Sequence, residues 1–392
     1  MKVALVHDYL SQDGGAERVL KSLHEIWPEA PIFVLFHDRD RLPFSETAEI
    51  HETFLARMPL IKSSFPWYLP LMPLATEKHD LRGFDVVLST SSIFAKGVIT
   101  NPNTLHISYC HTPPRFLWAE GGEYLSDLKR SRLVKMVLPG FIHRLRIWDQ
   151  LSTQRVDDFI ANSKTVNRRI LKYYRRDSEV IYPPVDTHLY QPSNTLENYF
   201  VAGGRLVPYK RIDLVVKVFN RLNIPLKIFG IGPELKLLKR IAKSNIQFLG
   251  KISEEEKRAL LARAQAFIHP QMEDFGITPI EAMAAGRPVI AYSQGGATET
   301  VIPEETGTFF TEQTWESLLQ AVLNFKAEDW DSQKIRNHSH IFGSEKFKNK
   351  ISSYVSDRYQ EFKQGLHQPG LKMGSYNFTV NSNFVSPADK LS

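Results

Sequence analysis

Short apolar, β-branched runs alternate along this chain with segments of helical periodicity. The apolar runs are KVALVH (2–7), FDVVLS (84–89), LHISYC (105–110), DFIAN (158–162), YFVAGG (199–204), LKIFG (226–230), IQFLG (246–250), AFIHP (266–270) and PVIAY (288–292). Patterned helices such as ERVLKSLHEIW and IDLVVKVFNRL lie between them. Because the runs are apolar on both faces, they predict parallel strands that are covered by helices on both sides. The pattern therefore predicts an α/β fold with doubly wound sheets.

The alternation is interrupted at IYPPVDTHLYQPSNTLEN (181–198), which is rich in proline and polar residues. A residue before proline is biased away from helix, so the stretch is typical of a linker. We therefore predict two Rossmann-like domains, 1–184 and 185–344, that face each other across a cleft. The tail, 367–392, has many small polar residues and little periodicity, and we expect it to be loosely ordered.

The composition of the chain mainly excludes certain classes of protein and partner. The 392 residues are 42% hydrophobic and 23% charged, as in soluble proteins, and the net charge of +6 gives no support to a nucleic-acid partner. Cys110 is the only cysteine, which excludes an internal disulfide and fits a reducing cytosol. The start, MKVALVHDYL, predicts a strand and not a signal peptide. No apolar run approaches the roughly 18 residues that span a bilayer.

The stretch EDFGITPIEAMAAG (273–286) combines a helix start with a candidate site. Thr278 at the N-cap, Pro279 at N1 and Glu281 at N3 would form a capping box, which needs no function. Capping leaves Glu273 and Gly276 unexplained. They lie in the loop after the predicted strand AFIHP, at the sheet edge where ligands bind and where free N–H groups attract anions. Both interpretations stay open for Glu281.

Two cations in GGRLVPYKR (203–211) follow the first strand of the second predicted domain. Arg205 and Lys210 are donors suited to phosphate, although two exposed cations can also be solvated surface. In the first domain, Gly14 and Gly15 form either a phosphate loop or a simple turn. His111 ends an apolar strand, and either a structural or a site role is open to it.

The sequence lacks the motifs of several other kinds of site. GIGPEL (230–235) begins like a dinucleotide fingerprint, but it lacks the third glycine, which argues against a dehydrogenase. The chain shows no Ser–His–Asp pattern and no spacing typical of a metal site. We therefore predict no metal and no cofactor.

Taken in order, several motifs resemble those of the retaining glycosyltransferases of family 4, which have the GT-B fold. The motifs are GGAERVL, CHTPPR, FIANS, IYPPVD, AGGRLVPYKRID, IGPEL, FLGKIS, EDFGITPIEAMAAGRPVIA and GGATETV, and they cover roughly residues 2–365. CHTPPRFLW with GRLVPYKRID is similar to the bacterial branch that builds envelope polysaccharides, including O-antigen mannosyltransferases. The resemblance also implies that a terminal helix, 345–366, crosses back to the first domain.

The resemblance implies a role for each candidate residue. Arg205 and Lys210 would bind the donor diphosphate, and Glu281 would bind the ribose. Glu273 and the backbone of Asp274, Phe275 and Gly276 would bind the donor sugar, and His111 would lie near the C6 hydroxyl of that sugar. The N–H groups of Ile277 and Thr278 would bind the distal phosphate, and Gly15 would close over the diphosphate. Lys251 and Ile252 would lie at the base. His111, Glu273, Arg205 and Lys210 form the predicted catalytic set, and the cations would replace a metal.

We also state expectations for the donor and the acceptor. We favour UDP-glucose because UDP-hexoses are common donors, with GDP-mannose as the alternative. A non-hydrolysing nucleotide-sugar epimerase and a non-enzymatic sugar-binding protein are the competing functions. The basic, apolar segment 128–151 and the aromatic stretch 64–74 predict peripheral contact of a cytoplasmic protein with an anionic membrane, and a lipid-linked oligosaccharide acceptor.

Overall fold

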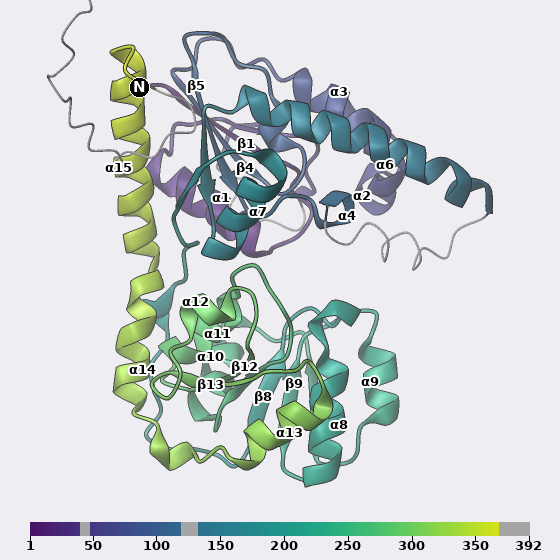
Figure 1. The fold of residues 1–392 in the computed structure, drawn as a ribbon, viewed down its shortest axis with the longest axis vertical. Coiled ribbons are helices and arrows are strands. Elements are labelled where there is room, and N and C mark those ends of the chain that lie inside the picture. Colours follow the sequence, from purple (N-terminus) through teal and green to yellow (C-terminus); the bar gives the residue numbers. More distant parts are fainter. Residues whose placement is uncertain (40–47, 119–131, 368–392) are drawn as a thin grey trace, which may run out of the picture.

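The computed structural model describes residues 1–39, 48–118 and 132–367 (Figure 1). The side chains of 63–66 and 132–137 are also not described. Most of the predicted tail, the beginning of the basic segment 128–151 and part of 64–74 therefore lie outside the described residues. The described chain forms two α/β units, one above the other in Figure 1.

The first unit is a parallel sheet with the strand order β3-β2-β1-β4-β5-β6-β7. Its strands are β1 (Val3–His7), β2 (Ile32–Val34), β3 (Ile50–Glu52), β4 (Val86–Ser91), β5 (Leu105–Cys110), β6 (Asp158–Ala161) and β7 (Ser178–Val180). Its helices are α1 (Gly15–Ile26), α2 (Ile61–Ser64), α3 (Met72–Glu77), α4 (Arg115–Trp118), α6 (Arg132–Ser152) and α7 (Lys164–Tyr174). The central strands β1, β4 and β5 are buried along their whole length, including the polar residues His106 and Ser108 of β5.

The second unit is a parallel sheet with the order β10-β9-β8-β11-β12-β13. Its strands are β8 (Phe200–Gly203), β9 (Leu226–Phe229), β10 (Ile246–Gly250), β11 (Phe267–His269), β12 (Val289–Tyr292) and β13 (Gly307–Phe310). Its helices are α8 (Ile212–Leu222), α9 (Leu235–Ile241), α10 (Glu254–Arg263), α11 (Ile277–Ala284), α12 (Ala297–Thr300), α13 (Trp315–Leu323) and α14 (Ser332–Ser339). The predicted α/β fold of two doubly wound sheets is confirmed.

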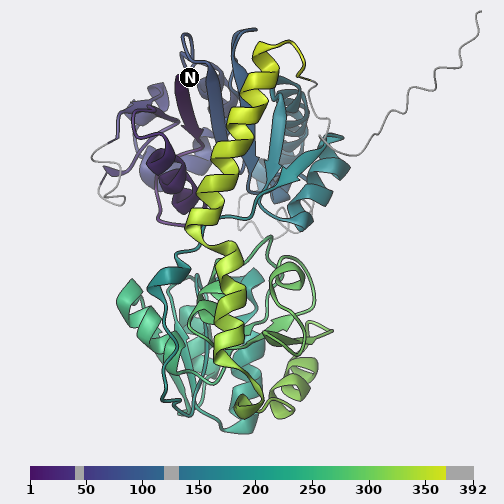
Figure 2. The ribbon, with the colours of Figure 1, turned by 90° about the vertical axis from the view of Figure 1, so that its left-hand side faces the viewer.

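The long helix α15 (Ser344–Lys363) follows α14 and runs beside the first sheet (Figure 2). Its buried residues Phe347, Ile351 and Val355 join the core formed by β1, β4 and β5. Arg358 adds a two-pronged ion pair with Asp158 of β6, with both N–O distances at 2.9 Å. The chain therefore passes between the two units twice, in the linker after β7 and at the start of α15.

Candidate active site

The ends of β8 and β11 carry the loops that face the first unit. Arg205 and Lys210 follow β8, and Glu273 and Asp274 follow β11. Since the two strands are neighbours in a parallel sheet, both loops lie at the same edge. Lys210 and Glu273 form an ion pair there, and the side chains are only 15% and 18% exposed.

Lys210 is subject to opposing effects. Burial and the guanidinium groups of Arg205 and Arg115 lower the pKa of Lys210 to about 8, whereas the contact with Glu273 favours the charged form. Arg205 is exposed, and its guanidinium donates to the Tyr209 hydroxyl over 3.3 Å. The loop therefore presents two cations, one half-enclosed and one open to solvent.

The start of α11 corrects one prediction. Gly276, and not Thr278, is the N-cap residue, with φ at +91°, and no side chain caps the helix. Thr278 lies inside the first turn, so the predicted capping box of Thr278, Pro279 and Glu281 is wrong. Glycine adopts this left-handed conformation without the clash that a Cβ causes. The first N–H groups of α11 consequently have no intrahelical acceptor and no capping oxygen.

The first turn of α1 meets the first turn of α11. A Cβ on Gly15 would lie 3.0 Å from Cδ1 of Ile277, so the glycine permits a close approach of the two units. Behind this turn, the Glu17 carboxylate accepts from the N–H of Gly14 over 3.0 Å. Two helix N-termini, one from each unit, thus converge at a point where an anion would be favoured.

Glu281 is 2% exposed and is held by two cations. Nζ of Lys257 lies 3.0 Å and Nη1 of Arg18 lies 2.8 Å from Glu281 Oε1. Burial alone would raise the pKa of Glu281, but Lys257 and Arg18 outweigh it and hold the pKa below its ordinary value. Glu281 is therefore an ionised carboxylate, and its partners are these cations and not the N-cap backbone.

Arg18 is the contact that sequence reasoning missed. It lies in α1 of the first unit and also reaches Glu254 of α10, with Nη2 3.2 Å from Oε1. The motif GGAERVL contains Arg18, but a pair 263 positions apart leaves no local signal.

Asp274 and Phe275 anchor the loop that follows β11. Asp274 forms ion pairs with Arg169 and, over 2.9 Å, with Arg115, both from the first unit. The side chain of Phe275 is buried and stacks on Tyr182. Only the backbone of Phe275 is therefore available to a ligand.

The motif GGATETV supports the same loop. The N–H of Gly296 donates to the carbonyl of Glu273 over 2.8 Å. A Cβ on Gly295 or Gly296 would lie 2.3 Å from the carbonyl oxygen of Glu273 or Phe275. The glycine pair is therefore a packing requirement that fixes the backbone around Glu273.

Two histidines lie near these loops as neutral rings. His111 Nε2 is 2.6 Å from the Thr90 hydroxyl, and burial together with His7 lowers the pKa of His111 to about 3. His269 is fully buried, its Nδ1 is 3.0 Å from Gln271 Nε2, and its pKa is also lowered to about 3 by burial. A Cβ on Gly276 would be 3.5 Å from Nε2 of His269, which places this ring beneath the loop.

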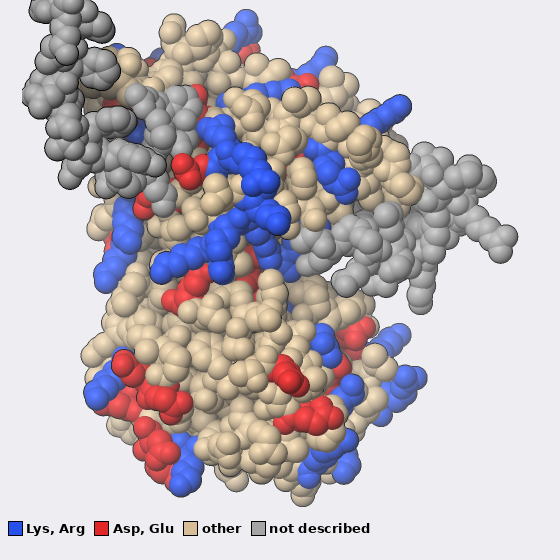
Figure 3. Space-filling model, viewed as in Figure 1, with Lys and Arg blue, Asp and Glu red and all other residues tan. Residues whose placement is uncertain are grey.

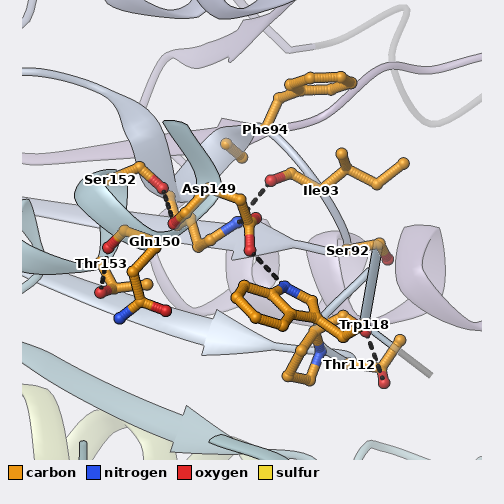
Figure 4. Close-up of polar contacts among 12 residues, drawn as sticks. Ser92, Ile93, Phe94, Thr112, Trp118, Asp149, Gln150, Ser152 and Thr153 are labelled. Carbon is orange, nitrogen blue, oxygen red and sulfur yellow. Dashed lines mark hydrogen bonds and ion pairs between the residues drawn. The ribbon is translucent and has the colours of Figure 1, made fainter. Parts of the chain in front are cut away.

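The segment after His111 is anchored by a buried charge network (Figure 4). Nζ of Lys96 lies 2.5 Å from Asp149 Oδ1, and Nε1 of Trp118 donates to the other oxygen over 2.7 Å. Both charged residues are almost completely buried, so each would be costly without the other. Asp149 thereby links α6 to α4, the helix that follows His111 along the chain.

Lys251 and Ile252 lie at the end of β10, just before α10. Lys251 is exposed, and Ile252 packs against the core of the second unit. The structure brings Gly15 and Ile277 together, and likewise Lys210 and Glu273. His111 contacts Thr90 and Tyr109 of the first unit.

In the part of the chain that the structure describes, no group of three or more His, Cys, Asp or Glu side chains could hold a metal ion. The described helices also include none with the length and apolar character needed to cross a membrane.

Two family models match the chain. One, described as Glycosyltransferase Family 4, matches residues 13–189, and the other, described as Glycosyl transferases group 1, matches residues 190–340. The two matches together span both α/β units. The chain belongs to glycosyltransferase family 4. The predicted family, the GT-B fold and the enzyme class are thereby confirmed.

Similar proteins include several mannosyltransferases. This family 4 enzyme is 25% identical over 382 residues to the alpha-1,3/1,6-mannosyltransferase ALG2 of Dictyostelium discoideum, covering 78% of this chain and 85% of that protein. It is 32% identical over 180 residues to the GDP-mannose-dependent alpha-(1-6)-phosphatidylinositol monomannoside mannosyltransferase of Mycolicibacterium smegmatis, covering 38% and 47%. The chain therefore spans about half the length of that second relative.

Among solved structures, HepE of Anabaena in complex with UDP is similar, with a TM-score of 0.65 at 16% identity. The match covers 91% of this chain and 100% of that one. At this identity the likeness shows the fold alone.

Proposed function

We propose that this enzyme transfers a hexose from a nucleotide-sugar to an envelope glycan acceptor, with retention of configuration. The observation that carries the proposal is the convergence of Gly15, the start of α11 and the cations after β8 at one edge of the cleft. Such a place suits a diphosphate, because helix N-termini and charged donors both stabilise anions. Two buried or half-buried carboxylates, Glu273 and Glu281, lie on either side and suit neutral hydroxyls.

We propose for each residue the role that the family resemblance implies. The diphosphate contacts Arg205, Lys210 and the N–H groups of Ile277 and Thr278, while Gly15 lets α1 close over it. Glu281 takes the ribose, and Lys251 and Ile252 flank the base. Glu273, with the backbone of Asp274, Phe275 and Gly276, takes the hydroxyls of the donor sugar, and His111, a neutral ring, lies near the C6 hydroxyl of that sugar.

In the transfer step, the bond from the sugar C1 to the phosphate oxygen breaks and its electron pair goes to the phosphate. The acceptor hydroxyl forms the new C1–O bond on the same face, and its proton passes to the leaving phosphate oxygen. Arg205, Lys210 and the α11 N-terminus stabilise the charge that develops there. We propose that these groups supply the stabilisation without a metal or cofactor.

GDP-mannose is the donor that we now favour over UDP-glucose. The relatives named above are mannosyltransferases, and the name of one states GDP-mannose dependence. UDP-glucose, the donor first expected, stays the second candidate on the general abundance of UDP-hexoses. Calorimetric or thermal-shift screening of GDP-, UDP- and ADP-sugars separates the two, because a donor at 100 times its Kd adds about 2.7 kcal/mol of stability.

The same screen, followed by product analysis, tests the competing functions. Transfer to an added glycan acceptor supports the proposal. Conversion of the nucleotide-sugar without any acceptor would instead indicate an epimerase. Binding without turnover, both with and without an acceptor, would indicate a sugar-binding protein.

We also propose contact of the first unit with an anionic membrane that carries a lipid-linked acceptor. Lys and Arg side chains form a band over this unit, where α7 lies, whereas the second unit shows mixed charges in the same view (Figure 3). Exposed side chains on α6 and α7 combine both kinds of group that a membrane surface favours, namely Arg144, Ile147, Leu151, Lys164, Arg168, Leu171, Lys172 and Arg175.

Sedimentation with anionic vesicles at low salt tests this contact. Lys172→Glu with Arg168→Glu is expected to abolish co-sedimentation, and Lys236→Glu, an equally exposed residue on α9, is expected to leave it unchanged. Failure of the unmodified protein to sediment would contradict the membrane proposal and leave donor binding untouched.

A further inference from the structure

Arg18 links the first unit to the carboxylate that is proposed to bind ribose. Its two terminal nitrogens contact two different acidic residues of the second unit, Glu281 at 2.8 Å and Glu254 at 3.2 Å. The Arg18 side chain is 33% exposed, whereas the side chain of Glu281 is only 2% exposed. The guanidinium of Arg18 therefore covers Glu281.

Lys257 keeps the buried Glu281 paired with a cation when Arg18 leaves, and the exposed Glu254 remains solvated. Nζ of Lys257 lies 3.0 Å from Glu281 and 2.8 Å from Glu254. Lys257 is itself buried, with a side chain 9% exposed, and it belongs to the same unit as both carboxylates. The cation that can move without leaving a bare buried charge is Arg18.

The position of Arg18 along α1 puts it within reach of a diphosphate. It is three residues after Gly15, whose missing Cβ lies against Ile277 at the start of α11. Glu281 lies four residues after Ile277, one turn along α11. The first turns of α1 and α11 thus lie against each other, with Gly15 opposite Ile277 and Arg18 opposite Glu281.

We propose that Arg18 is a donor-binding residue that exchanges partners. It pairs with Glu281 in the empty cleft, and it turns to the diphosphate of a nucleoside diphosphate when the ribose takes Glu281. The inference rests on the proposed function, because it takes Glu281 as the ribose ligand. An arginine suits the exchange, since its planar fork binds carboxylate and phosphate in the same geometry.

The exchange has opposite effects on two ligands. A nucleoside must compete with Arg18 for Glu281. Because it has no phosphate, it makes no new contact with the displaced Arg18. A nucleoside diphosphate also displaces Arg18, but it regains the cation through its phosphates. Removing Arg18 therefore strengthens nucleoside binding and weakens diphosphate binding, whereas removing a static clamp between the units weakens both.

Calorimetry on the full chain with Arg18→Gln tests the exchange, using GDP and guanosine or the pair whose base the donor screen selects. The Kd of the diphosphate is expected to rise about tenfold, in line with the loss of one charge-assisted hydrogen bond, and the Kd of the nucleoside is expected to fall. Arg18→Lys is expected to restore diphosphate binding in part. Lys21→Gln, exposed on the next turn of α1, is expected to change neither.

Equal weakening of both ligands, or no change in either, would overturn the exchange. A thermal unfolding scan shows whether Arg18→Gln is folded, and Arg18→Ala, which also removes the charge, gives the same readout if it is not. Glu281→Gln and Arg205→Ala separate the two hypotheses. If these variants also leave nucleotide affinity unchanged, the proposed donor site itself is wrong, and if only Arg18→Gln is silent, the exchange alone fails.

Discussion

At the scale of single residues, Lys210 shows how burial sets a working pH range. Its pKa is lowered to about 8, so its charge is complete near neutral pH and is lost as the pH rises through 8. Phosphate binding by Lys210 requires that charge. We therefore expect the Kd of a nucleoside diphosphate to rise above pH 8, by up to about tenfold per pH unit.

Calorimetry between pH 7 and pH 10 measures this effect. Lys210→Arg is the matched variant, because an arginine keeps its charge over the whole range. A flat profile for the unmodified protein would show that Lys210 does not lose its charge in this range, and the same slope in Lys210→Arg would show that another group governs the pH dependence.

Glu273 gives a second prediction at this scale. Glu273→Ala removes the partner of Lys210 and the proposed ligand of the donor sugar, and we expect kcat to fall on the order of 100-fold through loss of sugar positioning. Nucleotide affinity, which depends on the other end of the donor, is expected to change little. Turnover near that of the unmodified enzyme would show that Glu273 is not part of the site.

The roles of some residues can be predicted from the sequence, and the roles of others cannot. Glu273 and Gly276 were separable from a simple helix start, because capping chemistry did not explain them. The expected cap at Thr278 was wrong because a glycine in the left-handed region begins the helix two residues earlier. Arg18 could not be assigned, since its role depends on Glu281 and Glu254 in another unit.

At the scale of elements, the start of α11 depends on Gly276. A Cβ there would meet Glu273 and His269 at 3.4 and 3.5 Å, which is ordinary contact, so the strain of Gly276→Ala lies in the backbone at φ +91°. We expect a loss of about 1–3 kcal/mol in the free energy of unfolding. Gly140→Ala is the control, because Gly140 lies inside α6 with open space around it and should gain about 0.5–1 kcal/mol.

Urea unfolding of both variants gives the comparison. If Gly276→Ala is as stable as the unmodified protein, the left-handed start of α11 is not required. Loss of nucleotide affinity in the same variant would further link the backbone at Gly276 to the proposed phosphate site.

The strands differ in how well they can be predicted from the sequence. All nine predicted strands are present, including β11, whose three buried residues lie within the longer apolar run AFIHP. β2, β3 and β7 have only three residues each, which is too short for a period to show, and β13 reads GTFF without an alternation. These short strands include β3, β7 and β13 at the sheet edges, where less burial is required.

At the scale of the whole molecule, carboxylates of the second unit bind groups of the first unit. Asp274 pairs with Arg115 and Arg169, and Glu299 accepts from the N–H groups of Lys164 and Thr165 at the start of α7, each over 2.7 Å. Glu299 thus caps a helix that belongs to the other unit. Charges across a partly solvated interface weaken as salt rises.

We expect Asp274→Asn with Glu299→Gln to open the cleft in the absence of ligand. Small-angle scattering would then report a larger radius of gyration than that of the unmodified protein. Asp331→Asn is the control, since Asp331 caps α14 within the second unit and asparagine caps equally well. An unchanged radius in the double variant would show that these contacts do not hold the units together.

The central claim is that the cleft binds a nucleotide-sugar between the starts of α1 and α11. A crystal structure with the nucleoside diphosphate selected by the donor screen tests it most directly. The account predicts the diphosphate between Gly15 and the N–H groups of Ile277 and Thr278, with Arg205 and Lys210 in contact and the ribose on Glu281. A nucleotide bound elsewhere, or one in this cleft with its ribose away from Glu281, would contradict it.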